Sequence, residues 1–115
     1  MLNERDKDIL ERIIKYCDEI NQTIAMFDNT LETLKANVVY KNAVSMCILQ
    51  IGELTTHFSK EFITTASQIP WESIKKMRNI VAHHYGKFSI EILYGTIMES
   101  IPELREYCQK LIDVE

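Results

Sequence analysis

Basic and imidazole-bearing side chains cluster in one short segment, residues 75–87, which reads KKMRNIVAHHYGK. Between positions 71 and 87, four Lys or Arg residues stand against one acidic residue, a local net charge of +3 (4 − 1). The whole chain carries a net charge of −4. A local basic patch on an acidic protein attracts an anion such as a phosphodiester. The segment is therefore the first candidate for a functional site.

Arg78 and His83 have the side chains that a minimal ribonuclease site needs. An imidazole can take a proton from an RNA 2′-hydroxyl or give one to the leaving oxygen. A guanidinium can stabilise the charge that accumulates on the attacked phosphate. Because RNA supplies its own nucleophile, this chemistry needs no metal and no cofactor. Two copies of the pair across a dimer could supply both the acid and the base.

Helical geometry limits how these side chains can combine. Asn79 and His83 are four residues apart and share one face of a helix. Arg78 and His83 are five apart, about 140° round an ideal helix, so they converge only if the helix loosens or the arginine reaches across. His83 and His84 are about 100° apart and cannot chelate one metal together. Basic residues near a helix C-terminus also complement the helix dipole, so residue types alone leave a structural role open.

Composition indicates a helical domain. The chain has 115 residues, of which 46% are apolar, and it contains only 3 Gly and 2 Pro. An all-β sandwich or barrel needs many more turn residues. We therefore expect one all-α domain spanning 1–115. The negative net charge argues against non-specific electrostatic binding of nucleic acid by the whole surface, and we expect no DNA partner.

The cysteines and the apolar runs point to a reduced, cytoplasmic protein. Cys17, Cys47 and Cys108 are odd in number and widely spaced, which suggests neither a disulfide framework nor a zinc site. Each lies among apolar helical residues, as a core cysteine does. No apolar run approaches the length of a membrane span, and we expect no membrane partner.

Apolar periodicity predicts the first two long helices. The first runs from about Glu4 to Phe27, and polar residues at 28–30 end it. The second runs from about Leu31 or Asn37 to Phe58 and is apolar almost all the way round. A monomer of this size struggles to bury such a helix, so part of its surface is expected to be a subunit interface. Gly52 inside it predicts a close approach of another helix.

Turn and cap signals divide the second half of the chain. Residues 59–70 read as a connector with one short helical turn at Lys60–Thr65. A third helix is expected from Pro70 to His83 or His84, with Gly86 as its stop. The last helix is expected over about 89–114, capped by Ser89 and broken or kinked by Pro102 after Ser100. These elements predict an antiparallel bundle of four or five helices.

Three motifs together carry a resemblance to a known family. They are Ile69-Pro70-Trp71, Met77-Arg78-Asn79 and Ala82-His83-His84-Tyr85, with Ile51-Gly52-Glu53 upstream. The motifs that contain Arg78 and His83 are similar to the R-x4-H-x-Y signature of the HEPN superfamily. The combination resembles the HepT-like ribonuclease toxins that are paired with minimal nucleotidyltransferase antitoxins. The upstream motif resembles the "IGE" helix of that family, and the likeness covers nearly the whole chain.

The resemblance implies a fold, an activity and partners. The fold would be a homodimeric HEPN-like helical bundle with two R-x4-H motifs at a shared cleft. The activity would be that of the toxin in a type II/VII-like toxin–antitoxin system, a metal-independent endoribonuclease with Arg78 and His83 as the catalytic pair. Asn79 would orient His83 or contact the phosphate. Tyr85 would accept AMP from the partner nucleotidyltransferase, whose added charge and bulk would exclude an anionic substrate.

Several roles stay open at this point. Lys75 and Lys76 either face RNA or are solvated. Glu53 either pairs with Arg78 or the lysines across the bundle, or is an ordinary helix acid. The sequence at 86–89, GKFS, departs from the more usual aromatic–Gly–x–Asp of the family, which affects the loop beside the cleft. The alternative function is a non-catalytic HEPN module that binds a nucleotide and docks a partner nucleotidyltransferase.

Overall fold

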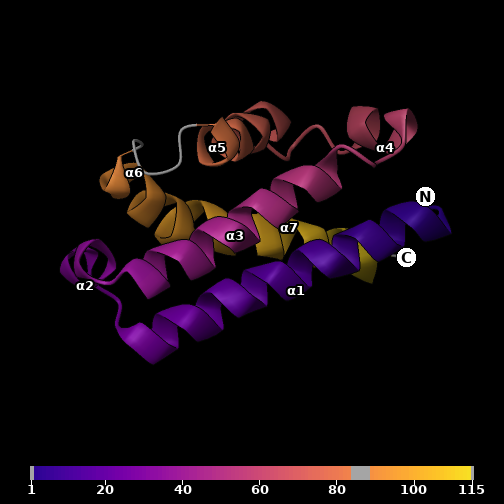
Figure 1. Cartoon of the computed structure of the whole chain (residues 1–115). Helices are drawn as coiled ribbons and strands as arrows, with labels where there is room; N and C mark the ends of the chain where they lie inside the picture. The colour runs from indigo at the N-terminus through magenta and orange to yellow at the C-terminus, as the bar shows by residue number, and fades with distance from the viewer. Residues whose placement is uncertain (1, 84–88, 115) are drawn as a thin grey trace.

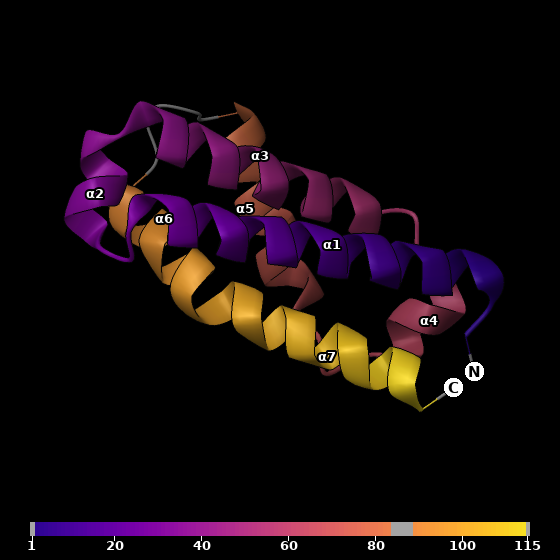
Figure 2. The ribbon, with the colours of Figure 1, turned by 90° about the horizontal axis from the view of Figure 1, so that it is seen from below.

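The computed structural model describes residues 2–83 and 89–114, and every regular element in these two ranges is a helix. Helices α1 (Glu4–Phe27), α3 (Val38–Thr55) and α7 (Ile101–Asp113) run along the length of the molecule. Figure 1 shows that α3 and α7 both run opposite to α1. Seen from below in Figure 2, α1 lies between them. The expected all-α antiparallel bundle is confirmed.

Short polar side chains begin five of the helices in the described ranges. Each accepts a hydrogen bond from a backbone N–H in the first turn, which would otherwise have no partner. The shorter helices are α2 (Leu31–Ala36), α4 (Lys60–Thr65) and α6 (Ile90–Gly95). The capping residues are Asn3 for α1, Thr30 for α2, Asn37 for α3, Ser59 for α4 and Ser89 for α6.

The bounds of the elements agree with most expectations and differ from them at two helix ends. The first helix covers Glu4–Phe27 as predicted. Of the two starts expected for the second helix, the structure has the one at Asn37, which leaves helical geometry and caps α3 through its side chain. Helix α3 ends at Thr55, three residues before the expected Phe58. Helix α5 (Trp71–His83) begins one residue after Pro70. The proposed stop at Gly86 lies outside the described residues.

A wider π-helical segment, Thr96–Ser100, joins α6 to α7. It ends just before Pro102, which stands in the first turn of α7. Proline has no N–H and cannot donate to a carbonyl of the preceding turn. The helix accommodates it by changing to π-helical hydrogen bonding instead of ending. The interruption expected after Ser100 is therefore a change of helix type.

The core fills the space between α1, α3 and α7. It contains fully buried aliphatic residues of α1 such as Leu10, Ile13 and Ile20, together with all three cysteines. The cysteines are free thiols, in agreement with their expected packing role. In the part of the chain that the structure describes, no helix has the length and apolar character needed to cross a bilayer.

Candidate active site on helix α5

Helix α5 carries the candidate site and is held at its N-terminal end by Trp71. The indole Nε1 donates a hydrogen bond to the carbonyl of Ala66 at 3.0 Å. The indole ring also meets the rings of Phe58 and Phe62 edge-on, with centroid separations of 5.3 and 6.0 Å. Edge-to-face contacts of this kind add to the energy of burial. The start of α5 is therefore tied to the α4 region by both packing and a polar bond.

Further along, α5 packs on α3 where Gly52 faces Arg78. A β-carbon placed on Gly52 would overlap Arg78 Cβ, and it would lie 2.5 Å from Arg78 Cγ and 3.5 Å from Arg78 Cα. Only glycine leaves room for this approach. The close helix contact predicted from Gly52 is confirmed, and its partner is the candidate catalytic arginine.

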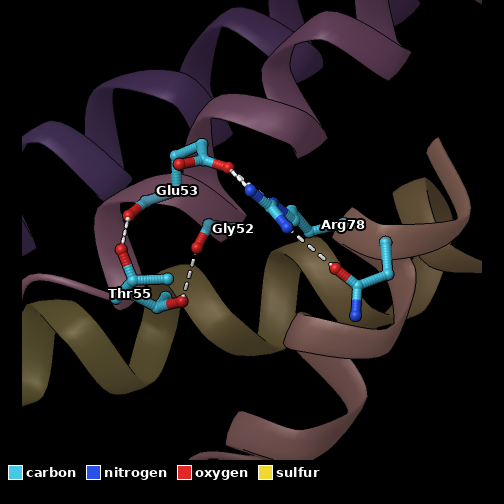
Figure 3. A network of polar contacts seen from close by, with 6 residues as sticks. Gly52, Glu53, Thr55 and Arg78 are labelled. Atoms are coloured by element: carbon cyan, nitrogen blue, oxygen red, sulfur yellow. Dashed lines mark hydrogen bonds and ion pairs between the residues drawn. The ribbon is translucent and has the colours of Figure 1, made fainter. Parts of the chain in front are cut away.

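The guanidinium of Arg78 is held between two polar side chains. Arg78 Nε donates to Glu53 Oε1 at 2.5 Å, and Arg78 Nη2 donates to the same oxygen. Arg78 Nη1 donates to Asn79 Oδ1 at 2.9 Å. Figure 3 shows the arginine pointing toward Glu53 on α3. Of the partners left open for Glu53, the structure selects Arg78, and the pair is partly exposed, at 30% for the arginine side chain and 43% for the glutamate.

An open groove of about 490 Å³ lies along the outer face of α5. Lys75, Lys76, Asn79 and His83 line it, so four of the predicted site residues share one concave surface. Three lining residues were not predicted: Glu72, Ser73 and Ile80. They stand three or four residues from the predicted ones and so share their helix face, which the sequence spacing already indicates.

Arg78 and His83 are not in contact in the described part of the chain. Arg78 turns toward α3, whereas His83 faces the groove, as expected from their angular separation on the helix. Asn79 connects the two surfaces, because its side-chain oxygen accepts from Arg78 and it also lines the groove with His83. The Asn79 amide thus contacts the Arg78 guanidinium and lines the same groove as His83, Lys75 and Lys76.

The remaining predicted residues of this region are not in the described part. His84, Tyr85 and Lys87 fall between the described ranges 2–83 and 89–114. Within those ranges no group of three or more His, Cys, Asp or Glu side chains could hold a metal ion.

The apolar surface expected on the second predicted helix is found on α3. Val38, Val39 and Met46 are 65%, 60% and 54% exposed. Beside Met46, an apolar hollow extends to α5 and is lined by Leu49, Val81 and Ala82, with Ser45 and Asn42. The Ser45 hydroxyl is buried, and no hydrogen-bond partner for it lies among the described residues.

Comparison with known proteins identifies relatives along almost the whole chain. A protein named "Putative RNase TTE0752" from Caldanaerobacter subterraneus is 27% identical over 92% of this chain and 93% of its own length. "Probable ribonuclease HepT" from Thermococcus cleftensis is 29% identical over 91% of this chain and 94% of its own. "Putative RNase MJ1216" from Methanocaldococcus jannaschii is 30% identical over 95% of this chain and 89% of its own. No solved structure gave a significant match.

The family comparison agrees with these relatives and with the motifs on α3 and α5. The family described as "Ribonuclease HepT-like" matches residues 7–111, from the first helix through most of α7. The matched range includes the Gly52–Arg78 contact and the basic groove. The chain therefore belongs to the HepT-like ribonuclease family.

Proposed function

We propose that this protein is a metal-independent endoribonuclease that cleaves RNA at a site containing Arg78 and His83. The observation that carries the proposal is the position of Asn79, which binds the Arg78 guanidinium and shares a groove with His83 and the two lysines. The groove is open, and its lining holds two lysines against one glutamate, a positive balance that suits a polyanion. Membership of the HepT-like ribonuclease family supports the same reading.

The reaction is a transesterification followed by release of the RNA product. The 2′-oxygen forms a bond to phosphorus, and the bond from phosphorus to the 5′-oxygen breaks. A base takes the proton of the 2′-hydroxyl, and an acid gives a proton to the departing 5′-oxygen. The products are a 2′,3′-cyclic phosphate and a 5′-hydroxyl. His83 supplies the imidazole for proton transfer, and Arg78 stabilises the charge on the phosphate oxygens.

Lys75 and Lys76 would bind the RNA backbone. Both are exposed and line the groove one helical turn before Asn79. Ammonium groups neutralise phosphates without reading bases, so they supply affinity and little sequence preference. Asn79 would orient His83 or contact the attacked phosphate.

A homodimer would complete the site. Val39 and Met46 are seven residues apart on α3, and Glu53 follows after seven more, so all three lie on one helix face and an interface there borders the Arg78 pair. Two imidazoles, one from each copy, could then act as base and acid.

The proposed role of the enzyme is that of a toxin controlled by an antitoxin. The chain resembles the toxins that are paired with nucleotidyltransferases, and on this basis Tyr85 would accept AMP from the partner enzyme. Tyr85 is two residues from His83 in the chain, so the added phosphate would place negative charge close to the groove. Anionic RNA would then be excluded.

A second candidate is a non-catalytic module that binds a nucleotide and docks a nucleotidyltransferase. Two observations favour it: the Arg78 charge is already paired with Glu53, and Arg78 and His83 do not touch. The two functions are distinguished by whether the protein cleaves RNA. Metal-free cleavage by the parent protein, with cyclic-phosphate ends, supports the ribonuclease, whereas binding of RNA or nucleotide without cleavage supports the module.

A further inference from the structure

The Ile51-Gly52-Glu53 segment lies near the end of α3, and the chemical steps above do not use it. We propose that Gly52 and Glu53 form a cradle that fixes the Arg78 guanidinium, so that its remaining N–H donors face a single phosphate group of the substrate. The inference rests on the proposed ribonuclease function. It makes Gly52 and Glu53 positioning residues, which act on the reaction only through Arg78.

Gly52 fixes where the arginine side chain begins. Because Gly52 has no side chain, Arg78 Cβ and Cγ can occupy the space beside it. A larger residue at position 52 would push α5 away from α3. Buried glycine inside a helix is otherwise unfavourable compared with alanine. The contact therefore explains why a helix-destabilising residue stands at this position.

Glu53 fixes how the guanidinium is turned. A guanidinium has five N–H donors in one plane. Three of them are used, because Nε and Nη2 each donate to Glu53 Oε1 and Nη1 donates to Asn79 Oδ1. One N–H on each terminal nitrogen is left. Two donors on neighbouring nitrogens are the arrangement that binds two oxygens of one phosphate.

The end of α3 provides a firm base for the cradle. The Thr55 hydroxyl donates to the Gly52 carbonyl at 2.7 Å, and the Thr56 hydroxyl donates to the Glu53 carbonyl at 2.7 Å. Figure 3 shows these bonds beside the Arg78 pair. The Glu53 carbonyl also accepts from the Thr56 backbone N–H at 3.2 Å, so the two hydroxyls add to the bonds that hold the backbone of both cradle residues.

This arrangement separates substrate binding from chemistry. The Glu53 carboxylate offsets the positive charge of Arg78, so the guanidinium adds little to long-range attraction of RNA, which falls to the exposed lysines. Its fixed orientation matters most when charge develops on the phosphate. A cradle variant should therefore lower kcat without raising KM.

The first test compares alanine at two glycines. Gly52→Ala places a β-carbon against Arg78, whereas at Gly95, in α6, an added β-carbon meets nothing within 4 Å. We expect Gly52→Ala to lower kcat about a hundredfold, with little change in KM, and Gly95→Ala to retain the parent rate. Both proteins are checked for helix content by circular dichroism. A folded Gly52→Ala protein with the parent kcat would overturn the proposal.

The second test removes the charge of Glu53. Glu53→Gln keeps the length of the side chain but loses the carboxylate, and Glu11→Gln on the exposed side of α1 is the control. We expect kcat to fall roughly ten- to hundredfold while KM stays equal or decreases, because a repulsive charge near the phosphate is lost. An increase in KM at unchanged kcat would contradict the cradle and indicate that Glu53 serves substrate binding.

A third readout does not depend on activity. In protein with ¹⁵N-labelled arginine, the Arg78 Nε–H resonance, assigned by its loss in Arg78→Lys, should be shifted and slow to exchange in the parent. It should move toward the solvated arginines in both Glu53→Gln and Gly52→Ala. If the parent cleaves no RNA, the ribonuclease proposal fails. The Arg78 Nε–H resonance then still tests whether Gly52 and Glu53 fix the guanidinium. A resonance unchanged by both substitutions would overturn the cradle even in an active enzyme.

Discussion

Asp6 accepts two hydrogen bonds from Ser59, one from its backbone N–H at 2.9 Å and one from its hydroxyl at 2.7 Å. Asp6 is 2% exposed. The same serine hydroxyl accepts from the Phe62 N–H and caps α4. A side chain near the start of α1 thus fixes the start of α4, which leads by way of Trp71 into the helix that carries the candidate site.

Replacing this carboxylate should destabilise the fold. In Asp6→Asn the amide can accept only at its oxygen, and one buried Ser59 donor loses its partner. Hydrogen bonds to charged groups are typically worth about 1.5–3 kcal/mol, so we expect the free energy of unfolding in urea to fall by about 2 kcal/mol. Asp8→Asn is the matched control, because Asp8 is exposed and pairs with Arg12 on the surface. Equal stabilities of the two variants would contradict the account.

The groove lysines should determine the salt dependence of RNA binding. Removing both charges in Lys75→Gln/Lys76→Gln deletes two phosphate contacts, each of which adds about 0.7 to the slope of log affinity against log salt for a single strand. We expect weaker binding of a single-stranded RNA at low salt and a slope reduced by about 1.4. Lys7→Gln, on the exposed surface of α1, should leave the slope unchanged. A parental slope in the double variant would place the RNA elsewhere.

The exposed apolar face of α3 should hold two copies together. Met46→Glu places a carboxylate at the proposed interface, where burial of an unpaired charge is costly. We expect sedimentation velocity to show dissociation at concentrations where the parent is a dimer, with the dissociation constant raised about tenfold or more. Met26→Glu is the control, since Met26 is 78% exposed on α1. A parent that stays monomeric, or a Met46→Glu dimer of parental strength, would exclude this interface.

The core cysteines predict a loss of stability in alkaline solution. Burial raises the pKa of Cys17 and Cys108 to about 12 and that of Cys47 to about 11. In the unfolded chain a thiol titrates near 8.5, so unfolding releases protons above this pH. The contribution to the free energy of unfolding is complete below about pH 8 and is lost as pH rises toward the folded values.

Urea unfolding at pH 7, 8.5 and 10 measures this effect. The free energy of unfolding of the parent should decrease across the two higher values. Cys108→Ala is less stable at every pH because it leaves a cavity, yet its decrease between pH 8.5 and 10 should be smaller. A slope equal to that of the parent would show that the Cys108 thiol does not contribute.

Local signals predicted the helices well, because caps and apolar periodicity act within a few residues. Ser89 and the ends of α1 are examples. The division at Asn37 was one of two readings, since an asparagine side chain can either cap a new helix or remain solvated. The π-helical segment was not predicted, because Pro102 indicates that regular winding fails without fixing how.

The site was predictable in its residues but not in its contacts. Gly52 indicated a close helix approach, yet the identity of its partner depends on how α5 packs across α3, which no local spacing encodes. For the same reason Glu53 had several possible partners. Glu72 and Ser73 share the helical face of Asn79 and could have been included from spacing alone.

Cleavage of a single-stranded RNA in EDTA, by the parent protein beside Arg78→Ala and His83→Ala, tests the central claim most directly. The account predicts products with 2′,3′-cyclic phosphate ends from the parent, and a loss of about a hundredfold or more in each variant. All three proteins should give the same circular dichroism spectrum. A folded parent that leaves RNA intact under these conditions, or variants that cleave at the parental rate, would contradict it.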